Sequence, residues 1–222
     1  MVYRTGERGE AARAASQAKI LRAAARLFAR KGYDATTMQD IVTDAGTSIG
    51  NVYFYFSNKE ALLRSLVESS SNAMFDDAER HTRHLTNGPE RVAAIIAFNT
   101  MTFLTTNRTM LGMLTSDSRL SVIRMLGDLA IQRWLPVLDD ALPAWPPLER
   151  PAIAAAIWGV NRSIVEGIER GVIVMPTREA VAFMVRWTMR ALGLTASRTE
   201  RIVVSSLRFA SRQLHTAQGN AR

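Results

Sequence analysis

Residues 32–63 read GYDATTMQDIVTDAGTSIGNVYFYFSNKEALL and decide the fold of the amino-terminal part of the chain. Thr37 can cap a helix start, with Asp40 three residues later to return the hydrogen bond. The apolar residues that follow share one helix face: Met38, Ile41, Val42 and Ala45. Gly46 is expected to end this helix, because glycine enters the left-handed conformation at low cost and turns the chain sharply.

A second short helix is predicted directly after that turn, over Ser48–Phe56, with Thr47 or Ser48 as its cap. Val52 and Phe56 lie on one face. The other faces carry small or hydrogen-bonding groups that suit base edges and phosphates: Ser48, Gly50, Asn51 and Tyr55. Two short helices around a glycine turn are the layout of a helix-turn-helix, whose second helix enters the DNA major groove.

A third helix is predicted to begin at Ser57-Asn58-Lys59-Glu60. Ser57 and Glu60 have the spacing of a capping box, which leaves Lys59 at a helix amino terminus. The free backbone amides and the Lys59 ammonium could hold a phosphate there.

Taken alone, the YFYF run is typical of a core or an edge strand, and one glycine turn between helices is a weak indication. The combination resembles the amino-terminal domain of the TetR family of bacterial transcriptional regulators. The resemblance covers about the first seventy residues and rests on these positions: Ile20-Leu21, Ala24-Ala25, Leu27-Phe28, Gly32-Tyr33, Thr36-Thr37, Ile41, Ala45-Gly46, Ser48, Gly50, Val52-Tyr53, Tyr55-Phe56, Lys59 and Leu62.

The resemblance implies an all-α fold with a three-helix DNA-binding domain at residues 1–62. Helix four, from about residue 58, would link it to a larger helical domain at 63–222 for effector binding and dimerisation. It further implies a homodimeric repressor, released from a near-palindromic operator by a small hydrophobic effector. Paired recognition helices about 34 Å apart would read successive major grooves of double-stranded DNA.

The resemblance also implies which residues contact the operator. Tyr53 and Lys59 match backbone-contacting positions. Gln39, Ser48, Ile49, Gly50 and Asn51 would face the bases. The full predicted set of DNA-binding residues is Thr37, Gln39, Thr47, Ser48, Ile49, Gly50, Asn51, Tyr53, Tyr55 and Lys59.

Charge is distributed unevenly along a chain whose formal net charge is +8. Residues 1–31 carry eight Lys or Arg against two Glu, as expected for a phosphate-binding segment just before a helix-turn-helix. Residues 177–222 carry eight Arg against two Glu. This second excess fits either a solvated helix face or a surface that attracts an anionic effector or partner.

Helical periodicity continues along the rest of the chain, and strand patterns are scarce. A first helix is expected over Ala15–Lys31, and helix four is expected to reach about Arg83. The later helices are expected near these ranges: Pro89–Asn107, Thr109–Leu114, Ser118–Leu142 with a bend at Pro136, Ala152–Arg170, Thr177–Leu192, and Ser197–His215 opened by a Ser197/Glu200 capping box.

Large apolar side chains in the second domain predict either ordinary core packing or the wall of a ligand pocket. The resemblance favours a largely apolar pocket with a few polar orienting groups. Arg108, Arg124 or Arg162 would favour an anionic ligand if turned inward. The predicted ligand-binding residues are Phe98, Asn99, Thr102, Phe103, Met113, Met125, Trp134, Trp158 and Asn161.

Several classes of protein are disfavoured by what the sequence lacks. It has no cysteine, no apolar signal-peptide core, and no uninterrupted apolar stretch that could cross a bilayer, which fits a cytoplasmic protein. The sequence contains no catalytic motif, and no cofactor is expected. No metal site is expected either, because His81 and His84 lie among acidic residues of a solvated helix. The alternative to a DNA-binding regulator is a helical ligand- or partner-binding protein of the same fold that no longer binds DNA specifically.

Overall fold

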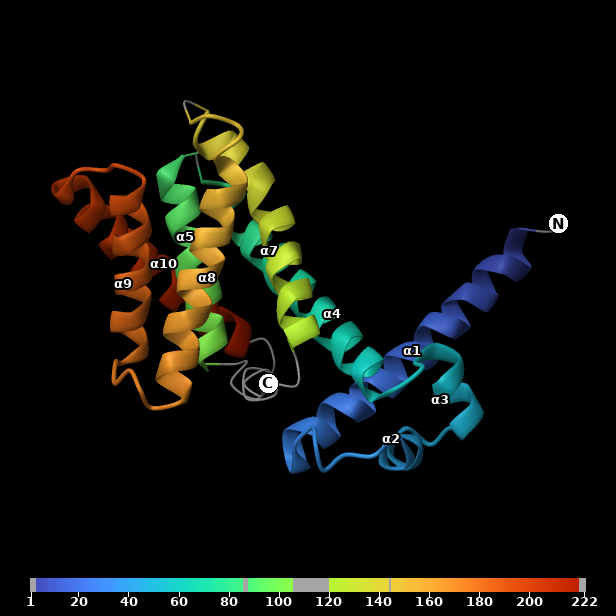
Figure 1. Ribbon diagram of the computed structural model, residues 1–222. Coiled ribbons are helices and arrows are strands. Elements are labelled where there is room, and N and C mark those ends of the chain that lie inside the picture. The colour runs from blue at the N-terminus through green and yellow to red at the C-terminus, as the bar shows by residue number, and fades with distance from the viewer. Residues whose placement is uncertain (1–2, 86–87, 106–119, 144, 220–222) are drawn as a thin grey trace. The chain divides into compact units, whose positions relative to one another are not determined.

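The structure is a computed structural model that describes residues 3–85, 88–105, 120–143 and 145–219. These residues form α-helices joined by short turns, and the described part of the chain holds no strand (Figure 1). This confirms the all-α prediction. The helices are α1 (Tyr3–Lys31), α2 (Met38–Ala45), α3 (Ile49–Tyr55), α4 (Lys59–Thr82), α5 (Pro89–Thr105), α7 (Leu120–Ala141), α8 (Arg150–Glu169), α9 (Thr177–Ala191) and α10 (Ala196–Gly219).

The chain divides into two compact units, residues 1–70 and residues 71–222. The division falls inside α4, the same helix in which the sequence placed a domain boundary after residue 62. One continuous helix is therefore shared between the two units.

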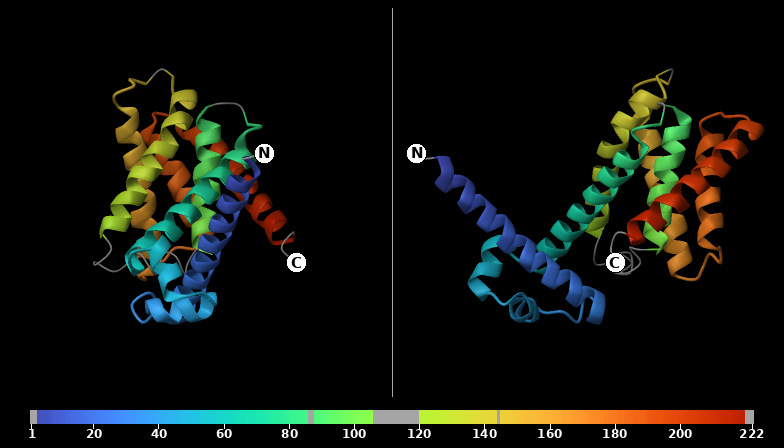
Figure 2. Two further views of the ribbon diagram at one scale, coloured as in Figure 1. Left: turned by 90° about the vertical axis from the view of Figure 1, so that its right-hand side faces the viewer. Right: turned by 180° about the vertical axis from the view of Figure 1, so that it is seen from behind.

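The first unit packs α1, α2, α3 and the start of α4 around a small apolar core. Its largest buried side chains are at most 3% exposed: Ile20, Leu27, Phe28, Ile41, Val52, Phe56, Leu62 and Leu63. α1 begins at Tyr3 rather than at the predicted Ala15, and its amino-terminal turns extend beyond α2 and α3 (Figure 2). Residues 9–15 are exposed and rich in alanine, arginine and glutamate, so helix propensity rather than burial accounts for these added turns.

Local capping fixes the ends of the short helices. Thr37 and Asp40 form both bonds of the predicted capping box, and Gly46 adopts the left-handed conformation at φ 54°. Ser48 caps α3 by accepting from the Asn51 amide. The predicted Ser57 cap of α4 is wrong: Asn58 Oδ1 accepts from the Ala61 amide at 2.8 Å, so the cap lies one residue later.

The second unit is built around α5, which packs against α9 and α10 on one side and α7 and α8 on the other (Figure 1). Because neighbours cover it on both sides, most of α5 is buried, including the polar residues Asn99 and Thr100. The Ser197/Glu200 capping box predicted for α10 is also wrong. Thr195 is the residue whose Oγ1 accepts from the Arg198 amide, and Glu200 instead forms a two-bond ion pair with Arg186 at 2.6 and 3.0 Å.

The remaining predicted boundaries of α7, α8 and α9 lie within two residues of the observed ones, and α10 runs four residues further than predicted. The helix predicted over Thr109–Leu114 lies outside the described residues.

Candidate functional site

The outward face of α3 is the most distinctive surface of the first unit. Val52 and Phe56 are buried at 0% and 3% exposure and anchor the helix to the core. Ile49, Tyr53 and Phe54 are 43%, 51% and 70% exposed. Large apolar side chains held at a protein surface by a buried anchor mark an interaction face rather than a core.

Phe54 is the member of this face that the sequence prediction left out. Residues of an α-helix advance by about 100° each, so the residue two positions after a buried one points roughly away from it. With Val52 in the core, helical spacing alone could have placed Phe54 outward. The YFYF run obscured this because four consecutive aromatic residues look uniformly apolar.

The other predicted contact residues surround this face in different states. Gly50 is exposed, and a Cβ built there would meet open space. Gln39 is exposed on α2, whereas Tyr55 is half-buried between the rings of Phe54 and Phe56. The hydroxyls of Thr37, Thr47 and Ser48 are engaged in local hydrogen bonds at the helix starts.

Lys59 has partners that the sequence did not reveal. Its ammonium donates to the backbone carbonyls of Tyr33, Asp34 and Thr36 at 2.8, 3.2 and 2.9 Å. It also lies 4.4 Å from the centre of the Tyr33 ring. An ammonium has three N–H donors, and all three are engaged by the turn between α1 and α2. The geometry therefore gives Lys59 a structural role, and its phosphate contact stays a prediction.

Asn51 is likewise engaged inside the protein. Its side-chain amide donates to Thr47 Oγ1 at 2.8 Å and to Ser16 Oγ at 3.1 Å. These bonds tie α3 to its own first turn and to α1. Both N–H donors of the side chain are used in this way, which gives Asn51 a positioning role. Its Oδ1 takes no part in these two bonds, and the base contact stays a prediction.

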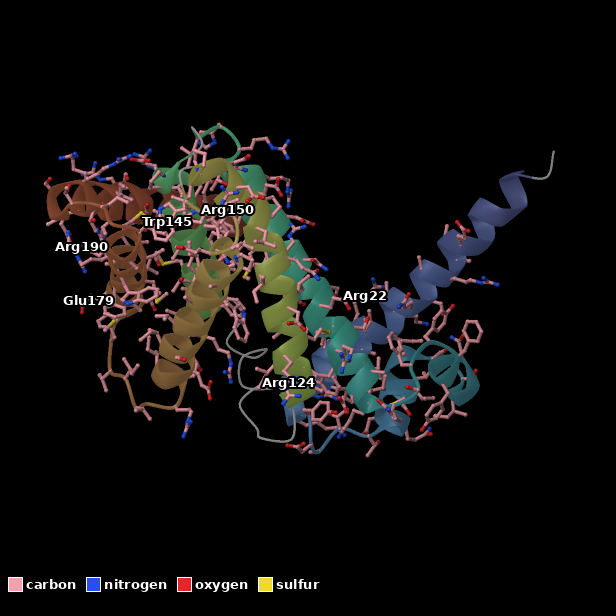
Figure 3. All side chains as sticks on the ribbon, turned by 45° about the horizontal axis from the view of Figure 1, so that its top comes forward. Arg22, Arg124, Trp145, Arg150, Glu179 and Arg190 are labelled. Atoms are coloured by element: carbon pink, nitrogen blue, oxygen red, sulfur yellow. The ribbon has the colours of Figure 1, made fainter. Side chains whose placement is uncertain are left out.

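Exposed basic residues also lie along α1, among them Arg22, which is labelled in Figure 3. Two other α1 cations are paired within the unit: Arg26 with Asp44 at 2.7 Å, and Lys31 with Asp40 at 2.6 Å. The hydrogen bond from Lys31, aided by bonds from Thr37, holds the pKa of the Asp40 carboxyl well below its usual range. Arg22 and Arg30 therefore add more to the attraction of phosphates than the paired cations do.

The second unit contains a partly open cavity of about 100 Å³ between four helices. Its wall is mostly aromatic and aliphatic, as the sequence predicted for a ligand pocket. The lining residues are Ser71, Met74 and Phe75 of α4, Ile96, Asn99 and Phe103 of α5, Ile123, Leu126, Leu129, Ala130 and Trp134 of α7, and Ile157, Trp158, Asn161, Arg162 and Val165 of α8.

The predicted ligand-binding residues divide between this wall and the core. Those that line the cavity are Asn99, Phe103, Trp134, Trp158 and Asn161. Phe98 is instead a core residue that stacks on His81 with ring centres 5.3 Å apart, and neither Thr102 nor Met125 belongs to the described wall. Met113 lies outside the described residues.

Three arginines could have attracted an anionic ligand if their side chains faced the cavity. Arg162 is the charged residue on the described wall, and it pairs with Glu166 at 3.1 Å. Arg124 lies exposed on α7 (Figure 3), and Arg108 falls outside the described residues. The cavity therefore presents little net charge to a ligand.

Metal and membrane sites do not appear in the described residues. They hold no cluster of three or more His, Cys, Asp or Glu side chains that could bind a metal ion. None of the described helices is both long enough and apolar enough to span a membrane.

Residues 20–66 match the family described as "Bacterial regulatory proteins, tetR family". The chain is 40% identical over 68 residues to the transcriptional regulator YfiR of Bacillus subtilis, a match that covers 31% of this chain and 33% of YfiR. It is 38% identical over 58 residues to IcaR of Staphylococcus epidermidis, a negative regulator of the biofilm operon icaADBC, covering 26% of this chain and 31% of IcaR. The match thus spans about a third of the length of these relatives.

Solved structures extend the likeness of fold to most of the chain. A TetR-family regulator from Syntrophomonas wolfei superposes with a TM-score of 0.68 at 18% identity, covering 82% of this chain and 97% of that one. RolR in complex with resorcinol superposes with a TM-score of 0.65 at 17% identity, covering 87% and 95%. Residues 20–66 therefore form a helix-turn-helix domain of the TetR family of bacterial regulatory proteins, and most of the chain shares the fold of solved TetR-family structures.

Proposed function

We propose that this protein is a homodimeric, sequence-specific DNA-binding regulator that represses transcription until a small molecule binds its second unit. The observation that carries the proposal is the outward face of α3, held by buried Val52 and Phe56. A helix presented this way fits the major groove, and the exposed cations of α1 in the same unit add to the attraction of phosphates.

Base contact falls to the exposed part of α3 and to the neighbouring end of α2. Ile49 and Phe54 offer apolar contact to thymine methyl groups, and the open space at Gly50 allows close approach of the backbone. Tyr53 offers a hydroxyl to a phosphate, as the sequence predicted. Lys59 and Asn51 act indirectly, by holding α3 and the turn before α2 in place.

Dimerisation is assigned to α9 and α10. Both helices bury one face in the second unit, yet Phe183 of α9 is 36% exposed and Val204 of α10 is 47% exposed. A second copy covering these side chains would provide the two recognition helices that a near-palindromic operator requires.

Response to a ligand is assigned to the cavity. RolR, of the same fold, has been crystallised with resorcinol, and a cavity between helices of this unit offers space for a small molecule here. Three wall residues, Ser71, Met74 and Phe75, belong to α4, which begins at Lys59 in the first unit. A ligand that prefers one position of α4 would shift the DNA-binding equilibrium by its differential affinity for the two positions.

Repression is favoured because IcaR, which matches the amino-terminal domain, is described as a negative regulator. The alternative, a protein of this fold that has lost specific DNA binding, would have no need for exposed aromatic residues on α3 beside a basic α1.

The test is a gel shift with DNA from upstream of the protein's own gene, with unrelated DNA of equal length as competitor. We expect retardation that survives the competitor, with two chains per operator by analytical ultracentrifugation. Tyr53→Ala and Phe54→Ala should weaken it, whereas Val172→Ala, at an exposed position of the second unit outside α9 and α10, should leave it unchanged. Equal affinity for operator and unrelated DNA would favour the alternative.

A further inference from the structure

Four polar side chains line the cavity of the second unit, and three of them do not determine which kind of ligand it binds. The Asn161 amide donates to Thr100 Oγ1 at 2.7 Å, so one of its donors is already engaged. Arg162 pairs with Glu166 and lies 5.8 Å from the centre of the Trp158 ring. The Ser71 hydroxyl can donate or accept and so does not select one polarity.

Asn99 is the fourth polar side chain and is different. It lies in the middle of α5 at 7% exposure and lines the cavity. Its Oδ1 is buried and accepts no hydrogen bond from any described residue. A buried acceptor without a donor is costly, and such groups in folded proteins are nearly always satisfied by something. A donor on a bound molecule would satisfy this one.

The size and walls of the cavity limit what that molecule can be. A cavity of about 150 Å³ lined by apolar side chains holds a benzene ring. This cavity is partly open and measures about 100 Å³, so it has room for no more than one ring. Phe103, Trp134 and Trp158 supply flat aromatic surfaces for packing against a ring. Because Arg162 is paired with Glu166, the wall offers a charged ligand no ion pair to offset the loss of its hydration.

We propose that the cavity binds a small, uncharged, single-ring aromatic molecule whose hydroxyl or N–H donates a hydrogen bond to Asn99 Oδ1. The inference rests on the proposed function in taking the cavity as the effector site, and it names the chemical class of the effector. Asn99 sets the polarity of the ligand, and the aromatic wall sets its shape.

The test compares three ring compounds on the full-length protein by titration calorimetry: phenol, anisole and benzoate. Phenol has the donor, anisole has a similar ring and oxygen but no donor, and benzoate is anionic. We expect phenol to bind about tenfold more tightly than anisole, the size of one hydrogen bond, and benzoate to bind more weakly than both. The proposal would be overturned if anisole bound as tightly as phenol, or if benzoate bound more tightly than phenol.

Two variants with substitutions in α5 test whether the preference for phenol over anisole depends on Asn99. Asn99→Leu keeps the same branched arrangement of side-chain heavy atoms without the polar groups, and it should reduce phenol affinity about tenfold while weakening anisole binding less. Thr102→Val is the matched control, because its hydroxyl is also buried and unbonded but does not line the described cavity. It should leave both affinities unchanged. An Asn99→Leu protein that keeps the phenol preference would refute the assignment, and the wild-type ratio decides the question if that variant fails to fold.

The proposed ligand class and the proposed DNA-binding function are tested separately, because the calorimetry is done without DNA. Phenol binding through Asn99 without any change in the gel shift would uphold the ligand class and reject the ligand-responsive mechanism. Specific DNA binding without a phenol preference would reject the ligand class and leave the DNA-binding function standing.

Discussion

Replacing Lys59 by methionine should destabilise the first unit, because it removes the ammonium that joins α4 to the turn before α2. Three carbonyls lose the Lys59 donor, those of Tyr33 and Thr36 at partly buried sites, while the Tyr33 carbonyl keeps its bond from the Thr36 amide at 3.2 Å. Hydrogen bonds to charged groups contribute about 1.5–3 kcal/mol each, but partial exposure lets water replace some of them. We expect the free energy of unfolding of the first unit to fall by about 2 kcal/mol, which is roughly a 30-fold increase in the population in which this unit is unfolded.

Amide hydrogen exchange is the assay that isolates this unit. All four tryptophans, Trp134, Trp145, Trp158 and Trp187, belong to the second unit, so tryptophan fluorescence reports on the wrong part of the chain. Exchange followed by mass spectrometry on peptides from residues 20–66 should accelerate roughly 30-fold. Peptides from the second unit should be unchanged.

Lys19→Met is the matched control. It removes the same charge from the same unit, but Lys19 makes one exposed bond, to the Gly46 carbonyl at 3.3 Å. Its effect should stay within about 0.5 kcal/mol. The reasoning fails if Lys59→Met leaves exchange unchanged and instead lowers the salt dependence of operator binding by about one phosphate, since that result would mean Lys59 contacts the DNA backbone.

Three further changes test the same unit. Asn51→Ala should lower its stability by about 1–2 kcal/mol and weaken all operator variants alike, measured by exchange and by gel shift; loss confined to one or two base positions would restore direct base contact. Asp40→Asn should destabilise at neutral pH. Because the pKa of Asp40 is lowered on folding, the difference from wild type should be full above about pH 4 and shrink as pH falls further; a pH-independent difference in urea unfolding followed by circular dichroism would contradict this. Gly46→Ala should cost about 1 kcal/mol through its left-handed backbone, whereas Gly50→Ala should leave thermal stability equal or higher and reduce operator affinity; equal stability effects would argue against the backbone explanation.

The helix ends and faces of the first unit could be read from sequence because they depend on residues within about four positions of each other. Thr37 and Asp40 are three residues apart, and Gly46 follows the last apolar position of α2. Burial of Val52 and Phe56 follows from helical spacing in the same way. The existence of a helix-turn-helix was therefore determined locally.

Choices between near-equivalent neighbours were not determined by sequence. Asn58 rather than Ser57 caps α4, and Thr195 caps α10 while Glu200 pairs with Arg186. In each case both candidates have suitable side chains. At α10, the pairing of Glu200 with Arg186 of α9 takes Glu200 away from the cap.

The roles of the polar site residues depended on tertiary structure even more strongly. Lys59 meets carbonyls 23–26 positions earlier in the chain, and Asn51 meets Ser16 at a separation of 35 residues. On the sequence both appear as free polar groups of a DNA-reading surface. Similarly, Asn99 and Asn161 look like equal orienting groups until folding gives Asn161 a partner in Thr100 and leaves Asn99 Oδ1 without one. Local periodicity fixes where a helix lies and which face is apolar, but a hydrogen bond forms only where folding brings donor and acceptor within about 3 Å.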